Sequence, residues 1–142
     1  MNNCIIVNYH YVENPHPSKS GITPCSVSDF DKQIKFLSEN YKIVLVPEVF
    51  QAAKESKSEK LCAITFDDGL NDQYENALPI LEKYKAVASF FIITSVFSGR
   101  LPTAHKIHSL LSKVPVGQLV DKFNGFLKDF YPFFLIAAAV HT

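Results

Sequence analysis

Residues 61–69 read Leu61-Cys62-Ala63-Ile64-Thr65-Phe66-Asp67-Asp68-Gly69, a short apolar run that ends in two acidic residues and a glycine. The run is rich in apolar and β-branched residues, which indicates a buried strand. Ligands of parallel α/β proteins gather at the carboxyl ends of strands, so Asp67 and Asp68 stand where a site is expected. Gly69 allows a sharp backbone turn after them, and the pattern alone is equally compatible with a plain Asp-Gly turn.

The two carboxylates are predicted to divide the chemical work. Successive side chains of a strand point to opposite faces, so Asp67 and Asp68 are not expected to share one proton as a facing pair. An arrangement in which one carboxylate binds a cation while its neighbour acts as a base suits this spacing better.

On both sides of this segment the sequence alternates between strand and helix patterns. Strands are predicted at residues 4–9, 43–46 and 87–93, and helices at 26–41, 47–54 and in a stretch that reaches residue 84. Pro79 lies inside the last stretch, so either a turn precedes that helix or the helix kinks there. The alternation predicts an α/β fold in which parallel strands are joined in βα units.

The pattern changes after residue 93. Helices are predicted at residues 104–113 and 116–128, and the apolar run 133–140 could form a further strand. The predicted organisation is one partial domain over residues 1–142, in which residues 98–142 form a helical insertion and a truncated tail.

Composition limits the partners and the location. The 142 residues carry 14 Lys+Arg and 14 Asp+Glu, so neither nucleic acid nor an anionic membrane is favoured electrostatically. The apolar run 133–140 is too short for a membrane span of ~20 residues. The chain starts without a signal-peptide pattern, and its cysteines (Cys4, Cys25 and Cys62) lack CxxC spacing, which predicts a reducing, cytoplasmic location.

Thr65 to Gly69 and its surroundings resemble the polysaccharide deacetylase family, the NodB-homology domain of carbohydrate esterase family four. The similar segments are Asn8-Tyr9-His10-Tyr11-Val12, residues 27–37, residues 71–84 and residues 87–92. The resemblance covers roughly residues 4–97. It implies that the chain forms the first half of a deformed seven-stranded (β/α) barrel.

The resemblance also implies an activity. Members of the family are metal-dependent hydrolases that remove acetyl groups from N-acetylated sugars, so a carbohydrate substrate is expected. Carried over to this chain, Asp67 is the catalytic base and Asp68 is a ligand of a divalent metal such as zinc. His10, at the end of the first strand, either reaches the site as a supporting or substrate-contacting group or is satisfied by local backbone.

The chain departs from the family pattern further on. The family's His-Ser/Thr-x-x-His motif is approached only by His105-Lys106-Ile107-His108-Ser109, in which the histidines are three residues apart on one helix face. His105, with His108, is therefore either a further metal ligand or an exposed helix histidine. No later family motif occurs before Thr142, so we expect the chain to stop within the barrel. The alternative function is a catalytically inactive fragment or association module, whose open sheet edges would favour self-association.

Overall fold

The computed structural model describes residues 4–55 and 58–130, and the chain divides into two compact units. The first unit runs to Pro15 and continues from Thr23 to Arg100, and the second contains His16–Ile22 and the described residues that follow Arg100. Within the described residues, no helix combines the length and the apolar character needed to cross a membrane.

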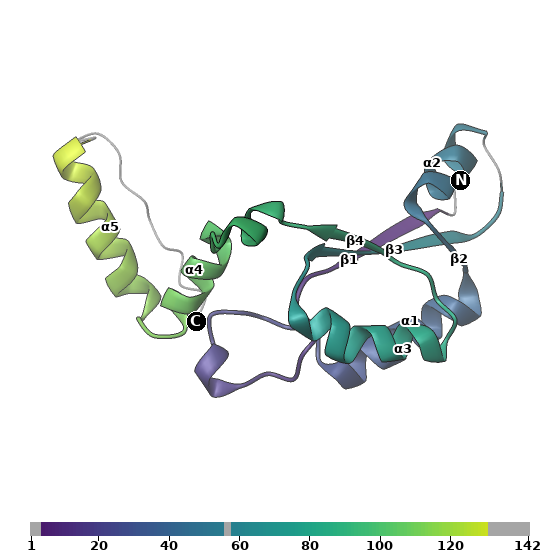
Figure 1. Ribbon diagram of the computed structural model, residues 1–142, viewed down its shortest axis with the longest axis horizontal. Helices are drawn as coiled ribbons and strands as arrows, with labels where there is room; N and C mark the ends of the chain where they lie inside the picture. Colours follow the sequence, from purple (N-terminus) through teal and green to yellow (C-terminus); the bar gives the residue numbers. More distant parts are fainter. Residues whose placement is uncertain (1–3, 56–57, 131–142) are drawn as a thin grey trace. The chain divides into compact units, whose positions relative to one another are not determined.

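The first unit is built on a four-stranded parallel sheet with β3 at its centre (Figure 1). The strands are β1 (Ile5–Tyr9), β2 (Lys42–Val44), β3 (Leu61–Asp68) and β4 (Ser89–Ile92). One side of β3 pairs with β1, from Ile5↔Cys62 to Tyr9↔Phe66. The other side is shared, because β2 pairs with the beginning of β3 and β4 with its end. All of these pairings are parallel, which confirms the predicted α/β fold.

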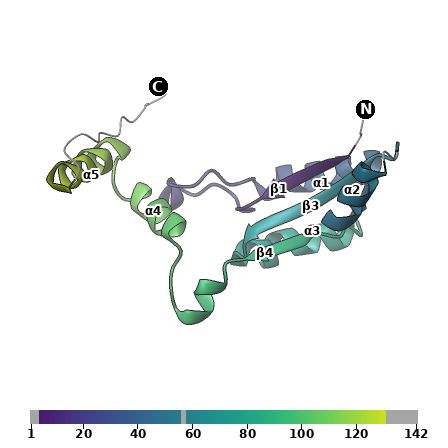
Figure 2. The same cartoon turned by 90° about the horizontal axis from the view of Figure 1, so that it is seen from above.

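Helices cover both faces of this sheet (Figures 1 and 2). Helices α1 (Val27–Asn40) and α3 (Leu78–Lys83) pack on one face, and α2 (Val46–Lys54) packs on the other. Because successive strand residues point to opposite faces, Ile64 and Phe66 enter the core beneath α1 and α3, whereas Ala63 enters the smaller core beneath α2. The wide apolar run of β3 therefore fills two cores.

Local sequence explains where two helices begin. Ser26 caps α1 by accepting a hydrogen bond from the backbone N–H of Asp29, as the capping-box spacing predicts. Pro47 lies in the first turn of α2, which begins at Val46, so β2 ends at Val44 rather than at the predicted residue 46.

The stretch around Pro79 resolves the predicted alternatives. A π-helical segment, Gln73–Ala77, precedes α3, and Pro79 occupies the first turn of that helix. The stretch is helical without a break from residue 71 to residue 83, and Leu78 still donates its backbone N–H to the carbonyl oxygen of Gln73. The helix therefore changes from π-helical to α-helical hydrogen bonding directly before Pro79, which lacks a backbone N–H, and no turn separates the two segments.

After β4 a 3-10 turn, Thr94–Ser98, leads out of the first unit. The second unit contains a 3-10 turn, Pro17–Lys19, and the helices α4 (Thr103–Leu111) and α5 (Val116–Phe130), which confirms the two helices predicted beyond residue 103. The predicted strand at 133–140 lies outside the described residues. That residues 98–142 form an insertion and a tail stays a prediction.

Candidate active site

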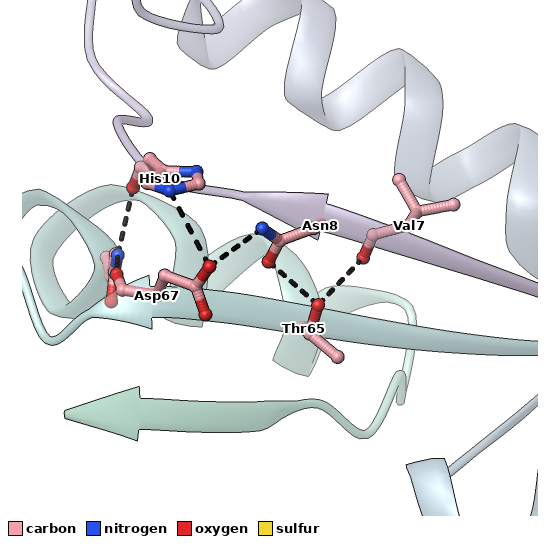
Figure 3. Close-up of polar contacts among 6 residues, drawn as sticks. Val7, Asn8, His10, Thr65 and Asp67 are labelled. Atoms are coloured by element: carbon pink, nitrogen blue, oxygen red, sulfur yellow. Dashed lines mark hydrogen bonds and ion pairs between the residues drawn. The ribbon is translucent and has the colours of Figure 1, made fainter.

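The candidate site lies where β1 and β3 end (Figure 3). Tyr9 and Phe66 form the last pair between these strands, and His10 and Asp67 follow directly. The Nε2 atom of His10 lies 3.6 Å from Oδ2 of Asp67, and the two side chains are 51% and 38% exposed. The structure thus brings His10 and Asp67 together, at a place that solvent can reach.

Asp67 has a second neighbour that the sequence did not point to. Asn8 donates a hydrogen bond from Nδ2 to Oδ2 of Asp67 at 2.9 Å. On its other side, Oδ1 of Asn8 lies 2.8 Å from the hydroxyl of Thr65, a side chain that is only 6% exposed. The signal that could have identified Asn8 is an amide side chain within the apolar run of residues 4–9.

Gln73 joins the backbones of the two strand ends. Its side chain is buried, and Nε2 donates to the carbonyl oxygens of His10 at 2.9 Å and of Asp67 at 2.6 Å. These bonds connect β1 and β3 one step beyond their last backbone pair. Gln73 therefore fixes the main chain from which both site side chains extend, a role that no sequence pattern indicated.

Asp68 begins the turn out of β3. Its φ angle is 76° and that of Gly69 is 69°, so two successive residues take the left-handed conformation. Aspartate tolerates this conformation better than most residues that have a side chain. Burial raises the pKa of the nearby Tyr11, and the negative charges of Asp68, Asp72 and Glu13 raise it further. The carboxylates of Asp68, Asp72 and Glu13 therefore lie close enough to act on the Tyr11 hydroxyl.

A zinc ion takes three or four protein ligands. Among residues 4–55 and 58–130, no group of three or more His, Cys, Asp or Glu side chains is placed to hold one ion. The carboxylate of Asp68 suits a divalent metal as one donor, but the described residues do not complete a ligand set.

The second predicted metal-ligand position lies on α4, in the second unit. The rings of His105 and His108 are neighbours there, with centroids 6.0 Å apart in an edge-to-face arrangement. Their spacing on one helix face is as predicted. Their participation in a metal site with Asp68 stays a prediction.

An apolar pocket of about 280 Å³ lies beside the turn after β3, and it is separate from the carboxylate of Asp67. Its lining consists of Gly69, Leu70, Gln73, Tyr74, Leu78, Phe90 and Ile92. Of the residues at the candidate site, only Gln73, which bonds to the ends of β1 and β3, also lines this pocket.

Comparisons with known proteins show which proteins this chain is similar to. Residues 54–109 match the family model of polysaccharide deacetylase. A poly-beta-1,6-N-acetyl-D-glucosamine N-deacetylase of Staphylococcus aureus is 38% identical over 106 residues, which cover 66% of this chain and 37% of the relative.

Two solved structures share the fold. The Streptococcus pyogenes deacetylase PplD, determined in complex with acetate, superposes with a TM-score of 0.60 and 29% identity, covering 68% of this chain and 45% of that chain. IcaB from Ammonifex degensii gives a TM-score of 0.55 and 26% identity, covering 65% and 39%.

Fold and site together define a parallel α/β protein with two carboxylates at the end of β3, and the deacetylase PplD shares this fold. Residues 54–109 carry the pattern of the polysaccharide deacetylase family, as the motifs predict. It spans 37% of the length of the Staphylococcus aureus relative.

Proposed function

We propose that this chain contributes to the hydrolysis of acetyl groups from an N-acetylated sugar polymer, with Asp67 as the general base. The observation that carries the proposal is the position of Asp67 at the end of β3, half-exposed and held through Oδ2 by Asn8 and His10. The family match over residues 54–109 and the N-deacetylase activity named for the Staphylococcus aureus relative support the reaction and the substrate class.

The chemistry asked of Asp67 is that of a general base. Water attacks the acetyl carbonyl carbon while the carboxylate takes the proton of that water. The protonated Asp67 then gives this proton to the leaving nitrogen as the C–N bond breaks, which releases acetate and leaves an amine on the sugar. Asn8 and His10 keep the carboxylate in one orientation, so that it need not reorganise when the water loses its proton. His10 has the further task of lining the place where the substrate approaches Asp67.

The proposal includes a divalent metal, zinc by resemblance, with Asp68 as one ligand and His105 as a candidate for another. Such an ion, when bound, activates water and polarises the acetyl carbonyl. Because the described residues supply an incomplete ligand set, we expect the chain to hold the ion weakly and to turn over slowly.

Acetate release from N-acetylglucosamine oligomers, measured with added zinc or cobalt, tests this function. We expect slow release that a chelator stops and that Asp67→Asn abolishes, because asparagine cannot take a proton from water. Asp121→Asn, the same chemical change on α5, is the matched control and should retain the activity of the unmodified chain.

Release that is equal in the unmodified chain and in Asp67→Asn, or absent from both, contradicts the proposal. In the second case the chain would be the inactive module that the sequence left as the alternative. Fast, metal-dependent release would instead contradict the expected weakness of the metal site, and His105 and His108 would then be the first side chains to replace.

A further inference from the structure

Thr65 and Asn8 form a chain of polar contacts that ends on the carboxylate of Asp67 (Figure 3). An ionised carboxylate only accepts hydrogen bonds, so Asn8 must present its Nδ2 donor to Asp67. The other end of the same amide, Oδ1, then faces Thr65 and can only accept. The Thr65 hydroxyl is therefore the donor, and the direction of every bond in the chain is fixed by the charge at its end.

A second acceptor competes for the single proton of the Thr65 hydroxyl. The carbonyl oxygen of Val7 lies 3.4 Å from Oγ1 of Thr65, whereas Oδ1 of Asn8 lies at 2.8 Å. Hydroxyl hydrogen bonds are typically ~2.7–2.8 Å long, so the contact with Asn8 takes the proton. Thr65 is almost fully buried, which limits the access of water as a third partner.

We propose that Thr65 and Asn8 are positioning residues that assign different tasks to the two oxygens of Asp67. The inference rests on the proposed function, in which Asp67 is the base. Within the described part of the chain, the side-chain contacts of Asp67 with Asn8 and His10 both fall on Oδ2. Oδ2 is thus the held oxygen, and Oδ1 is the oxygen that takes the proton from water.

Thr65 is needed to fix the orientation of the Asn8 side-chain amide. Asn8 itself is exposed, and an exposed amide can turn about its χ2 angle because that torsion has only a broad preference. The buried hydroxyl of Thr65 selects one of the two amide orientations, the one in which Nδ2 meets the carboxylate. Without that hydroxyl, Asn8 loses its fixed orientation and Asp67 loses a donor.

The side-chain amide signals of Asn8 test the contact chain directly by nuclear magnetic resonance, with isotope-labelled asparagine. Asn8→Ala identifies the signals by their loss. We expect one Asn8 amide proton at low field, since it is bonded to a carboxylate. Thr65→Val keeps the β-branched shape but removes the hydroxyl, so that signal should move toward the position of a free amide. Thr65→Ser keeps the hydroxyl and should retain it.

The backbone amide spectrum verifies that each variant is folded, and Asp67→Asn gives a second, independent change that should also move the Asn8 signal. An Asn8 signal that is the same in Thr65→Val and in the unmodified chain overturns the proposal.

Acetate release separates this inference from the proposed function. We expect Thr65→Val to lower kcat about tenfold with little change in KM, because the carboxylate is mispositioned while the substrate contacts remain, and Thr65→Ser to restore kcat. A shifted Asn8 signal with an unchanged kcat contradicts the division of tasks between the two oxygens. If the Asn8 signal shifts in Thr65→Val but neither the unmodified chain nor any variant releases acetate, the contact chain is supported. The proposed function is then contradicted.

Discussion

Asp67 and Asp68 are neighbours in sequence but differ in backbone conformation. Asp67 retains the strand conformation and contacts β1 through its side chain, whereas Asp68 has a φ angle of 76°. The rule that successive side chains alternate between faces applies to an extended backbone, and at Asp68 the chain leaves that conformation. The two carboxylates therefore have separate surroundings, which supports the proposed division into base and ligand.

That division predicts different effects of the same substitution at the two positions. We expect Asp68→Asn to weaken the binding of zinc or cobalt by about tenfold or more, because a ligand is lost. Asparagine also tolerates a positive φ, so the turn should persist in this variant. Asp67→Asn should leave metal binding nearly unchanged. Calorimetry or the absorption of bound cobalt measures both affinities.

Asp121→Asn on α5 controls for the loss of one negative charge from the chain as a whole. An equal loss of metal from Asp67→Asn and Asp68→Asn would show that the two carboxylates bind the ion together, and the assignment of separate roles would be wrong.

Cys62 is predicted to be the least reactive thiol of the first unit. Burial raises its pKa to about 11, and the thiolate is the reactive form of cysteine. Cys4 is half-buried, which makes it the internal reference. At pH 8 we expect iodoacetamide to modify Cys4 well before Cys62, and Cys62 to react quickly only in urea. Mass spectrometry of the digested chain reads out both sites, and equal rates in the folded protein would contradict the burial of Cys62.

At the scale of elements, the central strand and its helices were predictable because each is encoded by residues that are close together in the sequence. The apolar run before Asp67 predicts β3, and the capping spacing at Ser26 predicts the start of α1. The end of β2 was misplaced, because Leu45 and Val46 continue the apolar run of that strand while Pro47 sets the start of α2. The strand predicted from residue 4 begins at Ile5, and Cys4 just before it is only half-buried.

The turn after β3 offers a matched pair of glycine substitutions. Gly69 and Gly99 have φ angles of 69° and 74°, but only at Gly69 would an added Cβ meet a neighbour, 3.0 Å from Cγ2 of Ile92. The left-handed conformation costs a residue with a side chain ~1–2 kcal/mol. We expect Gly69→Ala to lower the free energy of unfolding by roughly 0.5–1 kcal/mol more than Gly99→Ala, because Ile92 must leave its preferred rotamer.

Urea unfolding followed by circular dichroism measures this difference. Equal destabilisation by the two alanines would show that Ile92, which lies on the exposed strand β4, moves aside without cost.

At the scale of the molecule, the sequence predicted the acidic pair of the site but not the network around it. Asp67 and Asp68 form part of a recognisable motif that follows a strand. The network consists of contacts made by Asn8, Thr65 and Gln73 between segments about sixty residues apart in sequence. A local sequence pattern does not show which distant segments will meet in the fold. Helices α4 and α5 were predicted from their sequence pattern, but that pattern carries no signal of what they pack against.

The exposed apolar surface of β4 predicts self-association. Phe90, Phe91 and Ile92 are 42%, 54% and 51% exposed, and within the described residues β1 and β4 each pair with β3 alone. Unpaired strand edges with apolar side chains favour contacts between chains. We expect size-exclusion chromatography to show oligomers, the chain to bind a hydrophobic dye, and the thermal transition to be broad.

Phe91→Lys should reduce this association, since a charge on an edge strand opposes pairing, whereas Phe36→Lys on α1 replaces a side chain of similar exposure and should have less effect. A sharp monomer peak with a cooperative transition above ~65 °C, the upper end for mesophilic domains, would contradict the expectation.

The central position of β3 has a consequence for the order in which the protein acquires its structure. Asn8 and Thr65, which meet beside the carboxylate, are separated by 57 positions along the chain, and β3 needs partners from before and after it in sequence. Contacts between distant segments form slowly because a long loop must close before they can be made. The candidate site should therefore appear together with the sheet during refolding. In the folded protein the amides of β3 should be the last to exchange with solvent, so the strand that carries the chemistry is also the one that opens only when the whole unit unfolds.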